Sequence, residues 1–97
     1  MALEFKNQLE AIDFGGLVAL PKVDIEARLR LQNIKLDDAS GVKEAITVIS
    51  ECFGENASAV KTFINNNLSV MDIAQLQVYL VGGQKMLDSV NKKLENA

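Results

Sequence analysis

The spacing of apolar residues predicts that most of the chain is helical. In "DDASGVKEAITVISECFG" the apolar side chains recur every three or four residues. They are Val42, Ala45, Ile46, Ile49, Cys52 and Phe53. Positions three and four apart share one face of a helix, so this stretch predicts a helix with one buried face. Asp38 or Ser40 caps its start and Gly54 ends it.

A shorter helix is predicted from about Asn56 to Asn66, with Val60, Phe63 and Ile64 facing inward. The stretch "NNN" at its end, together with Leu68, forms the turn to the next helix. Ser69 and Asp72 then make a capping box in its aspartate form, which starts a last and longer helix.

The last helix contains a pair of glycines, Gly82 and Gly83. Apolar or small residues recur in alternating steps of three and four on both sides of the pair, at Ile73, Leu76, Leu80, Gly83, Leu87, Val90 and Leu94. A helix that ended at the pair would have no reason to keep this phase, so the pattern predicts one continuous helix from Ser69 to Leu94. Gly83 then lies on the seam against another helix, and Gly82 is the site of any bending.

The first half of this helix is apolar beyond the seam, at Val70, Ala74, Val78 and Val81. Such a helix is either central in the core or pressed against a second protein surface. Tyr79 suits the rim of such a surface, with its hydroxyl group in water. The candidate partner-binding residues are Leu76, Val78, Tyr79, Val81, Gly83 and Leu87.

The stretch "VDIEARLRLQNI" fits two kinds of structure. Alternating apolar residues indicate a strand, whereas the spacing of Val23, Ala27, Leu31 and Ile34 indicates a helix. The helix is preferred because most residues are good helix formers, Asp24 can cap the start, and Glu26 and Arg30 form an i,i+4 ion pair.

The stretch "LEAIDFGGLVALP" is the least helical part of the chain. Gly15-Gly16 between two short apolar segments predicts a β-hairpin, and an irregular N-terminal arm is the alternative. The expected fold is therefore mainly α, with four helices, a short N-terminal β-hairpin and a long C-terminal helix. It forms a single domain over residues 1–97, with the hairpin or arm at 1–21 and the helical body at 22–97.

Composition excludes several function classes. With 97 residues, a net charge of −3 and scattered lysines and arginines, the chain does not suit nucleic-acid binding. Its apolar runs are too short for a membrane span, and "MALEFKNQ" has no apolar core of a secretory signal, so a cytoplasmic location is expected.

The chain has no histidine, and its one cysteine, Cys52, lies on a predicted buried helix face. We therefore expect no catalytic residue, no metal site and no cofactor.

The segment "ISECFGENASAVKTFINNNLSVMDIAQLQVYLVGG" resembles the small tail assembly chaperones of long-tailed bacteriophages and prophages. The similar features are the "FGG" hairpin, a Pro and an Asp before the first helix, the "CFGENASAV" junction and the capped "LSVMDI" helix. The resemblance implies a non-enzymatic protein in the bacterial cytoplasm that binds the tape measure protein, contacts tail-tube subunits and self-associates. The alternative is a structural neck or tail component, or a host helical oligomerisation module.

Many members of the resembled family are also made in a longer form by a ribosomal slip near the end of the short frame. Lys92-Lys93 is a candidate position, because adjacent lysine codons can form an A-rich run. The alternative is that these lysines complement the dipole of a terminal helix.

Overall fold

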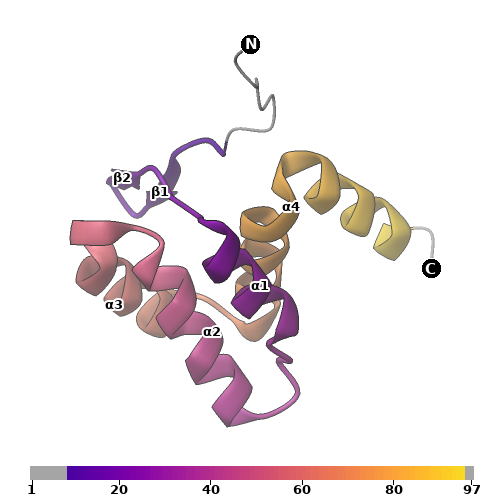
Figure 1. The fold of residues 1–97 in the computed structure, drawn as a ribbon, viewed down its shortest axis with the longest axis horizontal. Helices are drawn as coiled ribbons and strands as arrows, with labels where there is room; N and C mark the ends of the chain where they lie inside the picture. Colours follow the sequence, from indigo (N-terminus) through magenta and orange to yellow (C-terminus); the bar gives the residue numbers. More distant parts are fainter. Residues whose placement is uncertain (1–8, 96–97) are drawn as a thin grey trace.

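The computed structural model describes residues 9–95 and consists of a hairpin followed by four α-helices (Figure 1). The elements are β1 (Ile12–Phe14), β2 (Leu17–Ala19), α1 (Ile25–Asn33), α2 (Ala39–Glu51), the 3₁₀ turn η1 (Gly54–Asn56), α3 (Ala57–Asn67) and α4 (Val70–Glu95). The predicted fold class is confirmed. Residues 1–8, in which the sequence predicts no secretory signal, and residues 96–97 lie outside the described part.

The helices pack around α2, which contacts α1, α3 and α4. Each helix contributes at least one completely buried aliphatic side chain to a single core. The largest from each helix are Leu31, Ile49, Ile64 and Leu80. The central helix is therefore α2, and not the C-terminal helix, because the apolar face of α2 is covered by three neighbours.

The ambiguous stretch before α2 is a helix, as preferred. Asp24 caps α1 by accepting a hydrogen bond from the backbone N–H of Ala27 at 2.7 Å. The helical face points inward, with Leu31 buried, whereas Ile25 and Leu29, which completed the strand-like alternation, are exposed. The expected Glu26–Arg30 pair is wrong: Arg30 instead contacts Glu51 of α2, with 3.4 Å between Nη1 and Oε2.

Local capping signals correctly placed the starts of α2 and α4. Asp38 accepts a hydrogen bond from the Gly41 N–H at 2.8 Å at the start of α2. The Ser69 N–H donates to Asp72 Oδ2 at 3.0 Å, and the Asp72 N–H donates to Ser69 Oγ at 3.2 Å. This reciprocal capping box starts α4 as predicted.

The N-terminal hairpin is present and is antiparallel, with Phe14 opposite Leu17 across the Gly15-Gly16 turn. Both turn glycines have positive φ, and the Gly16 N–H donates to Asp13 Oδ1 at 2.7 Å. Phe14 is buried and packs edge-on against two rings, with centroid distances of 5.1 Å to Phe53 and 5.7 Å to Phe63. A two-stranded hairpin is marginal on its own, so this aromatic contact is what fixes it to the helices.

The C-terminal helix is bent, and its predicted continuity is wrong. Gly83 has φ 77° and ψ −172°, which no α-helical residue adopts, and the segment after it turns away from the first half of α4 (Figure 1). The expected close approach of another helix to Gly83 is also wrong, because no atom lies within 4 Å of where its Cβ would be. The bend is at Gly83 and not at Gly82.

The two glycines serve the bend in different ways. Gly83 supplies the positive φ, which side chains disfavour. A Cβ on Gly82 would collide with the side chain of Met86, which lies beyond the turn. Gly83 therefore supplies the conformation of the bend, and Gly82 supplies the space for it.

We expect Gly83→Ala to lower the free energy of unfolding by about 1–3 kcal/mol, because it forces a side chain into a sparsely populated backbone region. Gly82→Ala should also destabilise the fold, through its contact with Met86. Urea unfolding measures both, with Ser89→Ala as the exposed control in the same segment. Greater stability and higher helical content in Gly83→Ala would show instead that α4 prefers to be straight.

Candidate protein-binding groove

An open groove of about 450 Å³ lies between the hairpin and the bent C-terminal helix. We call it the hairpin–helix groove. One wall is the segment from Glu10 to Phe14, and the other is α4. Its apolar lining comes from Ile12, Phe14, Phe63, Leu68, Leu76, Tyr79 and Leu87, with Ala11 at one edge. The volume falls within the range of roughly 300–1,000 Å³ that is typical of binding pockets.

The groove exists because of two features of the backbone. Phe14 holds the hairpin against α3, which sets the position of the first wall. The bend at Gly83 places Gln84 and Leu87 on the same groove as Leu76, although a straight helix would carry them away along its axis. The groove is thus assembled from segments that are distant in the sequence.

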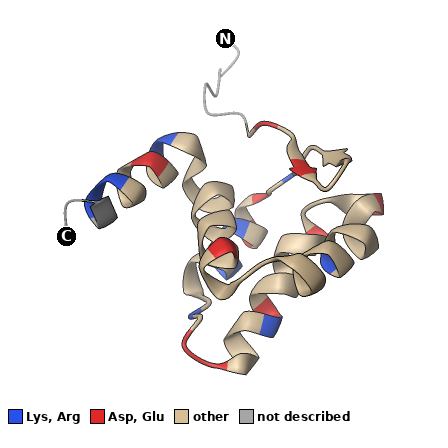
Figure 2. Ribbon diagram, turned by 180° about the vertical axis from the view of Figure 1, so that it is seen from behind, with Lys and Arg blue, Asp and Glu red and all other residues tan. Residues whose placement is uncertain are grey.

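Among residues 9–95, the charged residues of the groove are all acidic. Glu10 and Asp13 lie on the hairpin side and Asp72 lies in the first turn of α4, and no lysine or arginine of this described range lines the groove. Elsewhere in the described residues the two signs of charge are interspersed (Figure 2). The groove therefore combines an apolar lining with a negative rim.

Tyr79 joins the two walls of the groove. The backbone N–H of Glu10 donates to the Tyr79 hydroxyl oxygen at 2.8 Å, and the hydroxyl donates to the Glu10 carbonyl oxygen at 3.5 Å. The side chain is 9% exposed. The expectation of a rim tyrosine with its hydroxyl group in water is wrong, because the hydroxyl is used within the chain.

The structure brings together three of the six candidate partner-binding residues. Leu76, Tyr79 and Leu87 line the groove. Val81 packs against the core, Val78 is half-buried outside the groove, and Gly83 is buried at the bend. The apolar width of the first half of α4 thus serves both the core and the groove.

Sequence reasoning did not identify the hairpin wall of the groove. Ile12 and Phe14 line it together with Glu10 and Asp13. A signal was present, because alternation along the hairpin puts Ile12 and Phe14 on one face that must be covered by the helical body. The side of the helical body that covers this face depends on the Phe14 contact with Phe53 and Phe63, which is not visible in the sequence.

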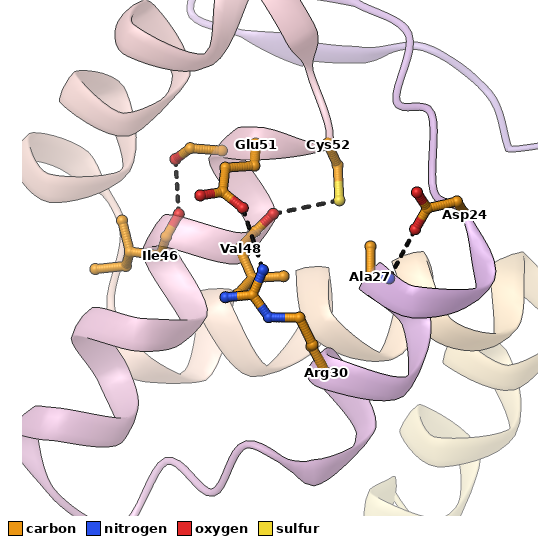
Figure 3. Close-up of polar contacts among 8 residues, drawn as sticks. Asp24, Ala27, Arg30, Ile46, Val48, Glu51 and Cys52 are labelled. Carbon is orange, nitrogen blue, oxygen red and sulfur yellow. Dashed lines mark hydrogen bonds and ion pairs between the residues drawn. The ribbon is translucent and has the colours of Figure 1, made fainter.

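A second, smaller recess of about 240 Å³ lies between α1 and the end of α2, with Cys52 in its lining (Figure 3). Cys52 is 4% exposed, and its thiol donates a hydrogen bond to the Val48 carbonyl oxygen at 3.3 Å. Burial, and then the nearby charges of Asp24 and Glu51, raise the pKa of the thiol, which Arg30 opposes. Cys52 is therefore a buried, neutral thiol, consistent with its prediction as a small hydrophobe.

Several large apolar side chains outside the groove are exposed. On the hairpin side and α1 they are Val18, Leu20, Ile25 and Leu29, and on α4 they are Val70, Met71 and Met86. Within the described residues, no helix is both long and apolar enough to span a membrane, and no group of three or more His, Cys, Asp or Glu side chains could hold a metal ion.

No family model, no curated protein and no solved structure matches this chain. The function is therefore argued from the groove and from the sequence.

Tyr79→Phe tests the contact that joins the groove walls. We expect a loss of about 1 kcal/mol in stability and faster hydrogen exchange at the Glu10 amide, because its hydrogen-bond acceptor is removed. Exchange measured by NMR gives the result, and Gln84→Ala is a control on the groove wall. Unchanged exchange at Glu10 would mean that the tyrosine does not hold this segment.

Cys52 should react with thiol reagents only when the protein opens. We expect labelling in native buffer to be at least about a hundredfold slower than in denaturant, because the thiol is buried and protonated. The folded state holds the thiol proton more tightly than the unfolded state, so stability should fall as the pH rises past the ordinary thiol pKa. Labelling at equal rates in both states would place Cys52 at the surface.

Proposed function

We propose that this protein is a non-enzymatic tail assembly chaperone that binds the tape measure protein during the assembly of a phage or prophage tail. The observation that carries the proposal is the hairpin–helix groove, an apolar and open surface with a polar rim. Amphipathic helices bind proteins by laying their apolar face into such grooves. The resemblance implies an aggregation-prone tape measure protein as the client, and we expect this client to present apolar helical segments of this kind.

The resemblance of the segment from Ile49 to Gly83 to small tail assembly chaperones supports the same function. That segment contributes Phe63, Leu76 and Tyr79 to the groove. The resembled region and the groove therefore coincide in part. Contact with tail-tube subunits and a location in the bacterial cytoplasm belong to the same proposal.

The proposed function can be tested by co-expression with the tape measure protein of the same phage or prophage. We expect the wild-type chain to increase the soluble fraction of the tape measure protein several-fold. Gln75→Trp should remove most of this effect, because Gln75 is an exposed residue of the groove and indole would fill the space. Gln32→Trp is the matched control, since Gln32 is an exposed glutamine of α1 outside the groove.

Circular dichroism should show the same helical content for both variants. An equal loss in both variants, or no effect of the wild-type chain, would contradict the proposal. Purified mature tails give a second test, because a chaperone is absent from them and a structural component is retained.

A structural or oligomerisation role is the second candidate, and exposed apolar residues of α1 favour it. Ile25 and Leu29 are four residues apart on one helix face and are 76% and 53% exposed. An apolar face of this kind can pair with another copy of the chain. Retention of the protein in mature tails, together with loss of self-association in Ile25→Glu, would favour this role.

A further inference from the structure

We propose that the hairpin–helix groove selects a helical segment whose apolar face is flanked by lysine or arginine. This inference rests on the proposed function, because it specifies the client of the same groove. Selection of such a segment depends on the charge of the rim, because the apolar lining alone does not distinguish basic from acidic clients.

The rim charges come from both walls of the groove. Glu10 and Asp13 lie on the hairpin wall and Asp72 on the α4 wall, and all three are exposed residues. A bound helix would have one acidic wall on each side of its apolar face. Basic residues on the two flanks of that face would then meet carboxylates on both sides.

These carboxylates are not neutralised by cations of the described structure. Asp13 accepts a hydrogen bond from the Gly16 N–H, and Asp72 accepts one from the Ser69 N–H. Both donors are uncharged backbone amides. The ion pair found among the described residues joins Arg30 to Glu51, outside the groove. The rim therefore carries negative charge that a basic partner can complement.

The uncharged part of the rim suits the same partner. Gln75 and Gln84 are exposed and lie on either side of the bend. Their amide groups can donate and accept hydrogen bonds. An acidic client would meet repulsion from three carboxylates, and no basic residue in the described part of the chain lines the groove to offset it. The rim charge thus makes the groove selective, because apolar segments that are otherwise alike bind with different affinities when their flanking charges differ.

The test uses two designed helical peptides of about 18 residues, long enough to hold partial helix in water. They share one Leu-rich apolar face, and one carries lysines on both flanks where the other carries glutamates. Fluorescence anisotropy at low salt measures binding to the full chain. We expect the lysine peptide to bind at least about tenfold more tightly, and the difference to shrink as salt screens the charges.

Glu10→Lys reverses one rim charge, and within the described residues the Glu10 carboxylate makes no hydrogen bond, since the contacts with Tyr79 use the Glu10 backbone. We expect this variant to lower the affinity for the lysine peptide by about three- to tenfold and to raise the affinity for the glutamate peptide. Glu55→Lys is the matched control, because Glu55 is an exposed acidic residue of η1 outside the groove. It makes the same change in net charge and should leave both affinities nearly unchanged.

Equal binding of the two peptides, or no binding of either, would overturn the inference. An equal effect of Glu10→Lys and Glu55→Lys would also overturn it, since only net charge would then matter. Concentration-dependent dimers that Glu10→Lys disrupts would show that a second copy occupies the groove instead.

Failure of the inference and failure of the proposed function give different results. If the wild-type chain keeps the tape measure protein soluble but binds both peptides equally, the chaperone function stands without charge selection. If the lysine peptide is preferred but the tape measure protein stays insoluble, the groove chemistry stands and the chaperone function does not.

Discussion

The fold depends on one apolar cluster to which every helix contributes. Leu31, Ile49, Ile64 and Leu80 are completely buried, one from each helix, and they belong to the same core. Full burial of such a side chain stabilises a protein by roughly 1.5–3 kcal/mol. A chain of this size has few such contacts to lose, so the four helices depend on one another more than on their own propensities.

The groove depends on the core through two attachments. Phe14 carries the hairpin into the aromatic contacts with Phe53 and Phe63, and Tyr79 ties the segment before the hairpin to α4. Both attachments join the N-terminal segment to residues of the helical body that are far away in sequence. The proposed binding surface therefore depends on the positions that the core gives to α3 and α4.

The sequence predicted those features whose causes are local. The capping residues Asp24, Asp38 and Ser69 act within three residues of their own position, so their effect was visible in the sequence. The hairpin was predictable for the same reason, because its two-residue glycine turn is local. Three groove residues of α4 were found through apolar spacing, whereas the hairpin wall required tertiary contacts.

The bend at Gly83 shows why the spacing argument failed there. Apolar periodicity records which residues need burial, but it does not record the backbone dihedral angles that bury them. A straight and a bent helix can both bury Leu87, and glycine permits either backbone. In the structure Leu87 is partly buried against the core from beyond the bend. A regular pattern can therefore cross a break in the helix that contains it.

The charge of the groove is linked to the stability of the elements that form it. Asp13 accepts a hydrogen bond from the hairpin turn, and Asp72 accepts one from the first turn of α4. Loss of such an acceptor costs about 1 kcal/mol, so a substitution that removes the side-chain oxygen of Asp13 or Asp72 weakens a wall of the groove. Glu10 is different, because within residues 9–95 its hydrogen bonds are made by its backbone, with Tyr79. Asp13 and Asp72 thus contribute both to the fold and to the charge of the rim, whereas the charge of Glu10 can change at little cost to stability.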